Sequence, residues 1–150
     1  MAKAPTPTGT YDDVNLILRL YEMRRESRLR EARSWFTAKF HAKTMEEMRA
    51  LCPPGSAEEA SMRMVVSYWD MVASFIGGGV LGPELFFESG REMLIAWIRV
   101  APFIEELRNA FGDPFVWHNL EKVGKQYAEW LNARAPGSYE KFAERISGIR

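Results

Sequence analysis

The stretch Gly77-Gly78-Gly79-Val80-Leu81-Gly82-Pro83 lies between two long segments whose apolar residues recur at helical spacing. Glycine has no Cβ atom and readily adopts the left-handed conformations that end helices, so the glycine run predicts the end of one helix. Proline favours the first position of a helix, where its missing N–H removes no hydrogen bond. The stretch therefore predicts a helix, a reversal of the chain and a second helix that begins at Pro83.

Apolar residues on both sides of this turn recur every three or four positions, as on the buried face of a helix. The stripe before the turn consists of Met62, Val65, Val66, Trp69, Val72, Ala73 and Ile76. The stripe after it consists of Phe86, Gly90, Met93, Leu94, Trp97, Ile98 and Ala101. Pro102 then predicts a kink or the start of a separate helix that runs to Phe111.

A further helix is predicted to open with Asp113 as its cap and Pro114 as its first residue. Gly90 and Gly124 lie within apolar stripes, which leaves two interpretations open: close approach of two helices, with an aromatic side chain of the partner helix over the glycine, or a glycine tolerated in a helix. Together the patterns predict an all-α fold, a single-domain helical bundle of about five to seven helices. Its centre is predicted to contain Trp69, Met93, Trp97, Tyr127 and Trp130.

The N-terminal region divides at about residue 10. Residues 1–10 are rich in proline and threonine and are expected to form a flexible tail, with Thr10 as a helix cap. Residues 11–150 are expected to form the single helical domain. Its first helix is predicted to run from residue 11 to about Phe40, although residues 24–28 interrupt the apolar pattern. This long N-terminal helix is basic, because residues 19–43 contain eight basic and three acidic side chains.

Composition excludes several classes of protein. Apolar residues make up 47% of the 150 residues, which is typical of a chain with a packed core and not of a disordered one. Twenty basic and twenty acidic residues cancel, so no overall field recruits nucleic acid or membrane. Cys52 is the only cysteine, which fits a reducing compartment. The apolar run over residues 93–104 is too short to span a bilayer, so a soluble, cytoplasmic protein without a transmembrane segment is expected.

No motif for catalysis or cofactor binding stands out. Gly77, Gly79 and Gly82 match the spacing of a dinucleotide-binding fingerprint, but the segment before them repeats at helical and not at strand spacing. His41 and His118 lack the glutamate three residues earlier that di-iron bundles need. We therefore expect no catalytic residues, no metal ligands and no cofactor.

Charged residues beside the aromatic stripes form a first candidate site. A charge at the edge of a core needs a partner, because an unpaired buried charge is costly. Asp70 or Glu121 is therefore expected to pair with Arg108 and to brace the helices. The alternative is a polar-lined ligand pocket between helices, formed by Asp70, Trp97, Arg108 and Glu121.

The basic first helix forms a second candidate site. Its middle is too charged to be wholly buried, which indicates that part of its apolar stripe faces a partner. The candidate partner-binding residues are Arg24, Arg25, Arg28, Leu29, Trp35 and Phe36. The alternatives are a solvated basic face, or contact with nucleic acid or an anionic membrane through Arg24, Arg25, Arg28 and Arg33.

From Tyr68 onward, a pattern of spacings extends over about half of the chain: Tyr68-Trp69-Asp70, the reversal to Gly82-Pro83-Glu84, then Trp97, Pro102 and Arg108, and finally residues 115–121. In this pattern the chain resembles an uncharacterised bacterial all-helical family of the domain-of-unknown-function kind. Some members of that family carry an N-terminal membrane helix, where this chain has its basic helix. The resemblance supports a helical fold and implies no activity.

These features favour a protein-interaction or regulatory module, whose partner is another protein or a second copy of the chain in a homodimer. A small-molecule-binding protein or an enzyme with an inter-helix pocket is the first alternative. Contact of the basic first helix with nucleic acid or a membrane surface is the second.

Overall fold

The computed structural model describes residues 9–148, and most of the predicted tail over residues 1–10 lies outside this range. The described residues form α-helices and one short 3-10 helix, η1, with no strand among them, so the predicted all-α fold is confirmed. The elements in chain order are α1 (Tyr11–Arg24), α2 (Ser27–Lys39), α3 (Met45–Leu51), α4 (Ala57–Gly77), α5 (Pro83–Phe87), α6 (Arg91–Val100), η1 (Ala101–Phe103), α7 (Ile104–Phe111), α8 (His118–Arg134) and α9 (Ser138–Gly148).

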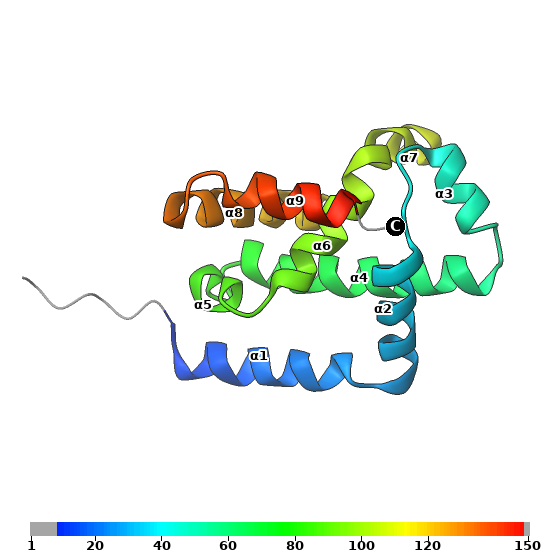
Figure 1. Ribbon diagram of the computed structural model, residues 1–150. Coiled ribbons are helices and arrows are strands. Elements are labelled where there is room, and N and C mark those ends of the chain that lie inside the picture. The colour runs from blue at the N-terminus through cyan, green and yellow to red at the C-terminus, as the bar shows by residue number, and fades with distance from the viewer. Residues whose placement is uncertain (1–8, 149–150) are drawn as a thin grey trace, which may run out of the picture.

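The central element is α4, a helix of 21 residues whose predicted apolar stripe is buried. It packs against α8 on one side and against α2 on another, while α9 packs against α6 and α8. Figure 1 shows α4 crossing the middle of the molecule, with α8 and α9 on one side and α1 along the opposite edge. The buried apolar side chains form one cluster that draws on all of these layers.

The predicted centre of the core is largely confirmed. Trp69, Met93, Trp97 and Tyr127 are buried, whereas Trp130 is only partly buried and packs against the cluster from outside. The glycine turn also forms as predicted, because α4 ends at Gly77 and Pro83 occupies the first turn of α5.

The helix predicted to run from residue 11 to Phe40 is wrong in one respect: the structure divides it into α1 and α2, and the chain bends sharply between them (Figure 1). The Glu26 side chain caps α2 by accepting a hydrogen bond from the backbone N–H of Leu29 at 3.0 Å. Arg33 donates through Nη1 to the carbonyl of Arg24 at 2.9 Å, which satisfies the end of α1. The polar segment that interrupts the apolar pattern is therefore the bend itself.

The helix predicted from Pro83 is also divided, because α5 ends at Phe87 and α6 begins at Arg91. Gly90 lies between them, and a Cβ atom at this position would collide with the ring of Phe86. The ring belongs to Phe86, only four residues earlier, and Gly90 lies outside both helices, so neither interpretation of a glycine within a helix holds at this position. At Pro102 the chain forms η1 before α7 begins, as one of the two predicted outcomes requires.

The predicted start of a helix at Pro114 is wrong, since residues 114–117 form turns and α8 begins at His118. The Asp113 carboxylate accepts from the N–H of Phe115 at 2.9 Å. Arg108 of α7 donates through Nε to the carbonyl of Val116 at 3.0 Å. The turn is therefore held by α7, which the local sequence does not reveal.

Candidate functional site

The outward face of α1 carries a row of exposed apolar side chains, which we call the α1 stripe: Tyr11, Val14, Leu18 and Tyr21. Their exposed fractions are 79%, 40%, 56% and 53% in chain order. The spacing of three, four and three residues is that of the seam between two packed helices. Four large apolar side chains along one free helix face are more than the scattered exposure of a typical surface.

The opposite face of α1 is fixed by Asp13 and Leu20, its two buried residues. The Asp13 carboxylate accepts from the N–H of Gly82 at 2.8 Å and from the N–H of Thr10 at 2.9 Å. These hydrogen bonds, from Gly82 first and Thr10 second, lower the pKa of Asp13. Tyr68 donates its hydroxyl to the carbonyl of Leu20 at 2.6 Å, and burial raises the pKa of Tyr68 to about 12.

The cations predicted for a partner separate into two groups. In the first group, Arg33 donates to the Glu92 carboxylate of α6 through Nε at 2.6 Å and Nη2 at 2.7 Å, and Arg24 forms an ion pair with the same carboxylate at 3.4 Å. The pKa of Arg33 is raised chiefly by its hydrogen bond to Glu92. Arg25 and Arg28 are exposed, and neither forms an ion pair within residues 9–148. Only the second group is available to an acidic partner.

The apolar residues predicted to face a partner lie mostly inside the protein. Leu29 and Phe36 are buried, with 8% and 2% of their surface exposed, because α2 packs against α4. The ring of Phe36 stacks on that of Phe40 with centroids 4.8 Å apart. Trp35 is partly buried and lines an open hollow. Within residues 11–40, the exposed large apolar side chains therefore belong to α1, and the periodic pattern alone does not distinguish this stretch from that of α2.

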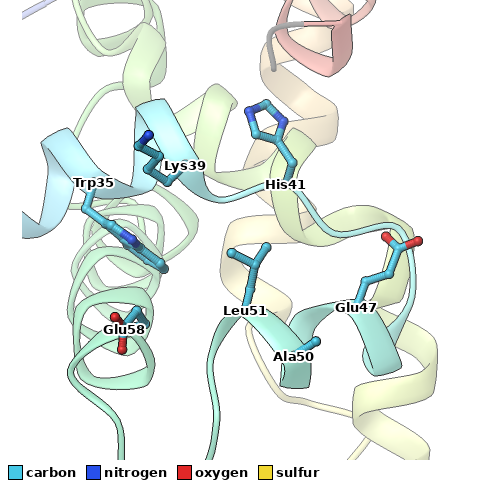
Figure 2. Close-up of a pocket in the computed structure, with 7 residues that line it drawn as sticks. All are labelled: Trp35, Lys39, His41, Glu47, Ala50, Leu51 and Glu58. Carbon is cyan, nitrogen blue, oxygen red and sulfur yellow. The ribbon is translucent and has the colours of Figure 1, made fainter.

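The hollow beside Trp35 lies between α2, α3 and α4 and has a volume of about 680 Å³. Figure 2 shows Trp35 extending towards Glu58 of α4, while Leu51 and Ala50 of α3 form the other wall. The hollow is wide open to solvent and its polar groups do not converge on a point. Among the described residues, no three His, Cys, Asp or Glu side chains lie close enough to hold a metal ion.

The predicted ion pair of Arg108 forms with Glu121, at 3.0 Å between Nη1 and Oε1. Arg108 is 7% exposed and also contacts Glu105 at 3.2 Å. Burial acts to raise the pKa of Glu121, but the hydrogen bonds and charges of Arg108 and Lys125 together lower it. The pair joins α7 to α8, as expected of a brace.

Asp70 has a different role from the predicted alternative, because it caps α8. Its Oδ1 atom accepts from the N–H of Leu120 at 2.9 Å, in the first turn of α8, where a negative charge is favourable. Trp117, the residue at the cap position, has a left-handed φ of 52° and makes no side-chain cap of its own. A carboxylate of α4 thus supplies the cap that the local sequence lacks.

Trp97 packs directly over Gly124 of α8. A Cβ atom at position 124 would lie 2.6 Å from Cδ1 of Trp97, so glycine is required for this contact. Close approach by an aromatic side chain, one of the two interpretations of this glycine, is confirmed. All four residues of the predicted ligand pocket, Asp70, Trp97, Arg108 and Glu121, form contacts within the protein. Ligand binding by them stays a prediction.

A family model described as a domain of unknown function, DUF4760, matches residues 10–130. The chain belongs to the DUF4760 family. The match extends from the cap of α1 into α8, well beyond the half of the chain that carried the resemblance. The residues matched by the DUF4760 model include the α1 stripe and also Asp13 and Gly82, whose hydrogen bond holds α1 in place. Neither the curated proteins nor the solved structures give a significant match to the chain.

No helix within residues 9–148 combines sufficient length with sufficient apolar character to span a bilayer.

Proposed function

We propose that this protein is an interaction module that pairs with a second copy of itself through the α1 stripe. The observation that carries the proposal is the exposure of four apolar side chains at the spacing of a helix–helix seam. A face of this kind gains from being covered, because each exposed apolar side chain costs free energy in water.

The order of residues in the α1 stripe favours a second copy as the partner. Read in either direction, the stripe is a tyrosine, an aliphatic residue, an aliphatic residue and a tyrosine, with spacings of three, four and three. A two-fold pairing requires a self-complementary surface. In an antiparallel pair, Tyr11 would face Tyr21 of the second copy, and Val14 would face Leu18.

Charge supports the same arrangement. The first turn of α1 carries the exposed Asp12, and its C-terminal end is followed by the exposed Arg25. Antiparallel pairing brings the acidic end of each helix beside the basic end of the other and separates the like charges. Parallel pairing would do the reverse.

The expected interface is small. A helix of 14 residues is about 21 Å long, so one helix pair covers less than the roughly 1,200 Å² at the low end of stable interfaces. We expect a dimer that dissociates in the micromolar range and exchanges partners readily. Such reversible pairing is suited to regulation.

Sedimentation of the purified protein over a range of concentrations tests the proposal. The unaltered chain is expected to shift from monomer to dimer as its concentration rises, whereas Leu18→Glu remains a monomer. Val80→Glu is the matched control, because Val80, in the glycine turn, is an apolar residue more exposed than Leu18, at 71% against 56%. It is expected to dimerise normally.

Self-association is refuted if the unaltered chain remains monomeric at the highest concentration, or if both variants weaken the dimer equally. Addition of nucleic acid or anionic vesicles at low salt checks the alternative contact through Arg25 and Arg28. Binding there that weakens steeply with salt, in a protein that stays monomeric, would favour that alternative.

A further inference from the structure

Arg99 of α6 is a buried cation with no acidic partner among residues 9–148. Only 4% of its surface is exposed. Nη1 donates to the carbonyls of Phe36 at 3.3 Å and Phe40 at 2.5 Å, and Nη2 donates to the carbonyl of Thr37 at 3.2 Å. These carbonyls lie at the C-terminal end of α2, whose partial negative charge stabilises a cation. No ion pair of Arg99 occurs in the part of the chain that the structure describes.

The guanidinium group has donors that remain unused. Arginine has five N–H groups, and three hydrogen bonds are formed, none of them by Nε. The edge of a guanidinium group formed by Nε and Nη2 can hold a carboxylate, as Arg33 does with Glu92. We call the corresponding side of Arg99, whose Nε forms no hydrogen bond within residues 9–148, its free edge. A carboxylate is the group whose planar geometry matches this edge.

A second buried nitrogen without a partner lies close to Arg99. The Nε2 atom of His41 has no hydrogen-bond partner, and the side chain makes no hydrogen bond within residues 9–148. Figure 2 shows its imidazole turned away from Leu51 and Glu58. Buried polar groups in proteins are nearly always paired, so two orphans in one place require an explanation.

His41 and Arg99 line the same cavity, of about 520 Å³, between the α2–α3 loop, α6 and the end of α9. Lys43 adds a second cation at its wall, and Ile98 and Pro102 add apolar surface. Glu47 also lines the cavity, but its carboxylate accepts the backbone N–H of Lys43 at 2.8 Å. Burial, and then the charge of Arg99, lower the pKa of His41, so the ring is neutral and can donate one N–H at neutral pH.

We propose that this cavity binds a small aliphatic carboxylate, held by Arg99 and His41. The carboxylate would take the free edge of Arg99 and the N–H of His41, and its short hydrocarbon chain would lie against Ile98 and Pro102. Both nitrogens are covered in this structure, so binding requires the side chains around them to move. Lys43 strengthens the attraction without contacting the carboxylate closely.

Titration with butyrate tests the proposal, with butyramide as a neutral control of the same shape. The readouts are the Nε–H signal of Arg99 and the imidazole signals of His41 in nitrogen-edited NMR spectra of the full chain. Butyrate is expected to shift both sets of signals saturably, with millimolar affinity, and butyramide is expected to leave them in place. Equal shifts with both compounds, or none with butyrate, would overturn the proposal. Inorganic phosphate that shifts the signals where butyrate does not would overturn the assignment of a carboxylate.

Variants locate the binding. His41→Ala is expected to weaken butyrate binding about tenfold, because it removes a hydrogen bond to a charged group. Lys43→Ala is expected to weaken it by a smaller factor, and Lys39→Ala, the same change in the neighbouring hollow of Figure 2, to leave it unchanged. Arg99→Lys keeps the charge but loses the planar edge, so it is expected to abolish binding. If Arg99→Lys does not fold, unaltered affinity in His41→Ala still refutes the site.

Discussion

α6 and α8 meet through closely fitted apolar side chains, whereas α1 packs on the core with only part of its apolar side chains and is also held by polar contacts. Met93 and Tyr127 are fully buried, and Trp97 fills the space above Gly124. In α1, by contrast, Asp13 and Leu20 are the buried residues. The helix is positioned by the Asp13 carboxylate, by the hydroxyl of Tyr68 and by the Glu92 ion pairs.

The same periodic pattern of apolar residues therefore has two structural outcomes in this protein. Close apolar packing gives large, diffuse stabilisation that depends little on pH or salt. Polar anchors fix the position of a helix while leaving its other face free. The α1 stripe therefore stays exposed, whereas the apolar stripes of α6 and α8 are buried in the fold.

The largest difference between the two regions should come from truncating one apolar side chain in each. Trp97→Ala is expected to lower the free energy of unfolding by about 3–5 kcal/mol, because it leaves a cavity over α8. Leu18→Ala in α1 is expected to change it by less than about 0.5 kcal/mol, because the side chain is exposed. Urea unfolding of dilute protein measures both. Similar losses would show that α1 is packed as firmly as the core.

A single added methyl group probes the fit between α6 and α8. Gly124→Ala is expected to destabilise the protein by about 1–3 kcal/mol, because the new Cβ atom would overlap Trp97. Gly77→Ala is the matched control, since it has open space around it at the end of α4 and gains helix propensity of up to about 1 kcal/mol. Thermal and urea unfolding should give changes of opposite sign.

The polar attachment of α1 and α2 is tested by neutralising Glu92. Glu92→Gln is expected to cost about 1–2 kcal/mol, because the half-buried Arg24 and Arg33 lose their shared carboxylate. Glu88→Gln makes the same change in an exposed pair with Arg134 and is expected to cost less than about 0.5 kcal/mol. The difference should shrink as salt is added, if charge is its source.

The smallest effect on global stability, and the most local one, is expected from acid. The pKa of Asp13 in the folded protein lies below the ordinary value of 3.8, so its anchoring is complete above that value and is lost as the pH falls through the lowered pKa. Amide signals of α1 should shift in this range before those of α8. Asp13→Asn, which cannot ionise, should show no such step, and a simultaneous change in both helices would contradict a local anchor.

Much of the fold could be predicted because most helices are specified by residues within or directly beside them. The stripe of α4, the glycine turn and Pro83 act within a few residues of one another. The errors arose where a distant residue decides the outcome. The bend after Arg24 is capped by the nearby Glu26 but is also held by Glu92 of α6, and the start of α8 depends on Arg108 and Asp70.

The candidate site was predictable only in part, for the same reason. The sequence shows that the region from residue 11 to 40 carries more apolar surface than its charged middle can bury, but the choice between Phe36 and Leu18 rests on the packing of α2 against α4. Arg99 was visible as a charge in an apolar run. The partners of Arg99 are backbone carbonyls at the end of α2 and not an acidic side chain. They could not be predicted, because the bend before α2 sets where this helix ends relative to α6.

The hydrogen bond between Asp13 and Gly82 joins positions 69 residues apart in the chain. Ribosomes add about 5–20 residues per second, so a newly made α1 waits for seconds before the residue that docks it has been synthesised. During that interval the part of the chain against which α1 packs has not yet been made, so its apolar side chains are exposed. Where several ribosomes translate one message, neighbouring nascent chains would meet through this helix first, and assembly of two copies would begin before either has finished folding.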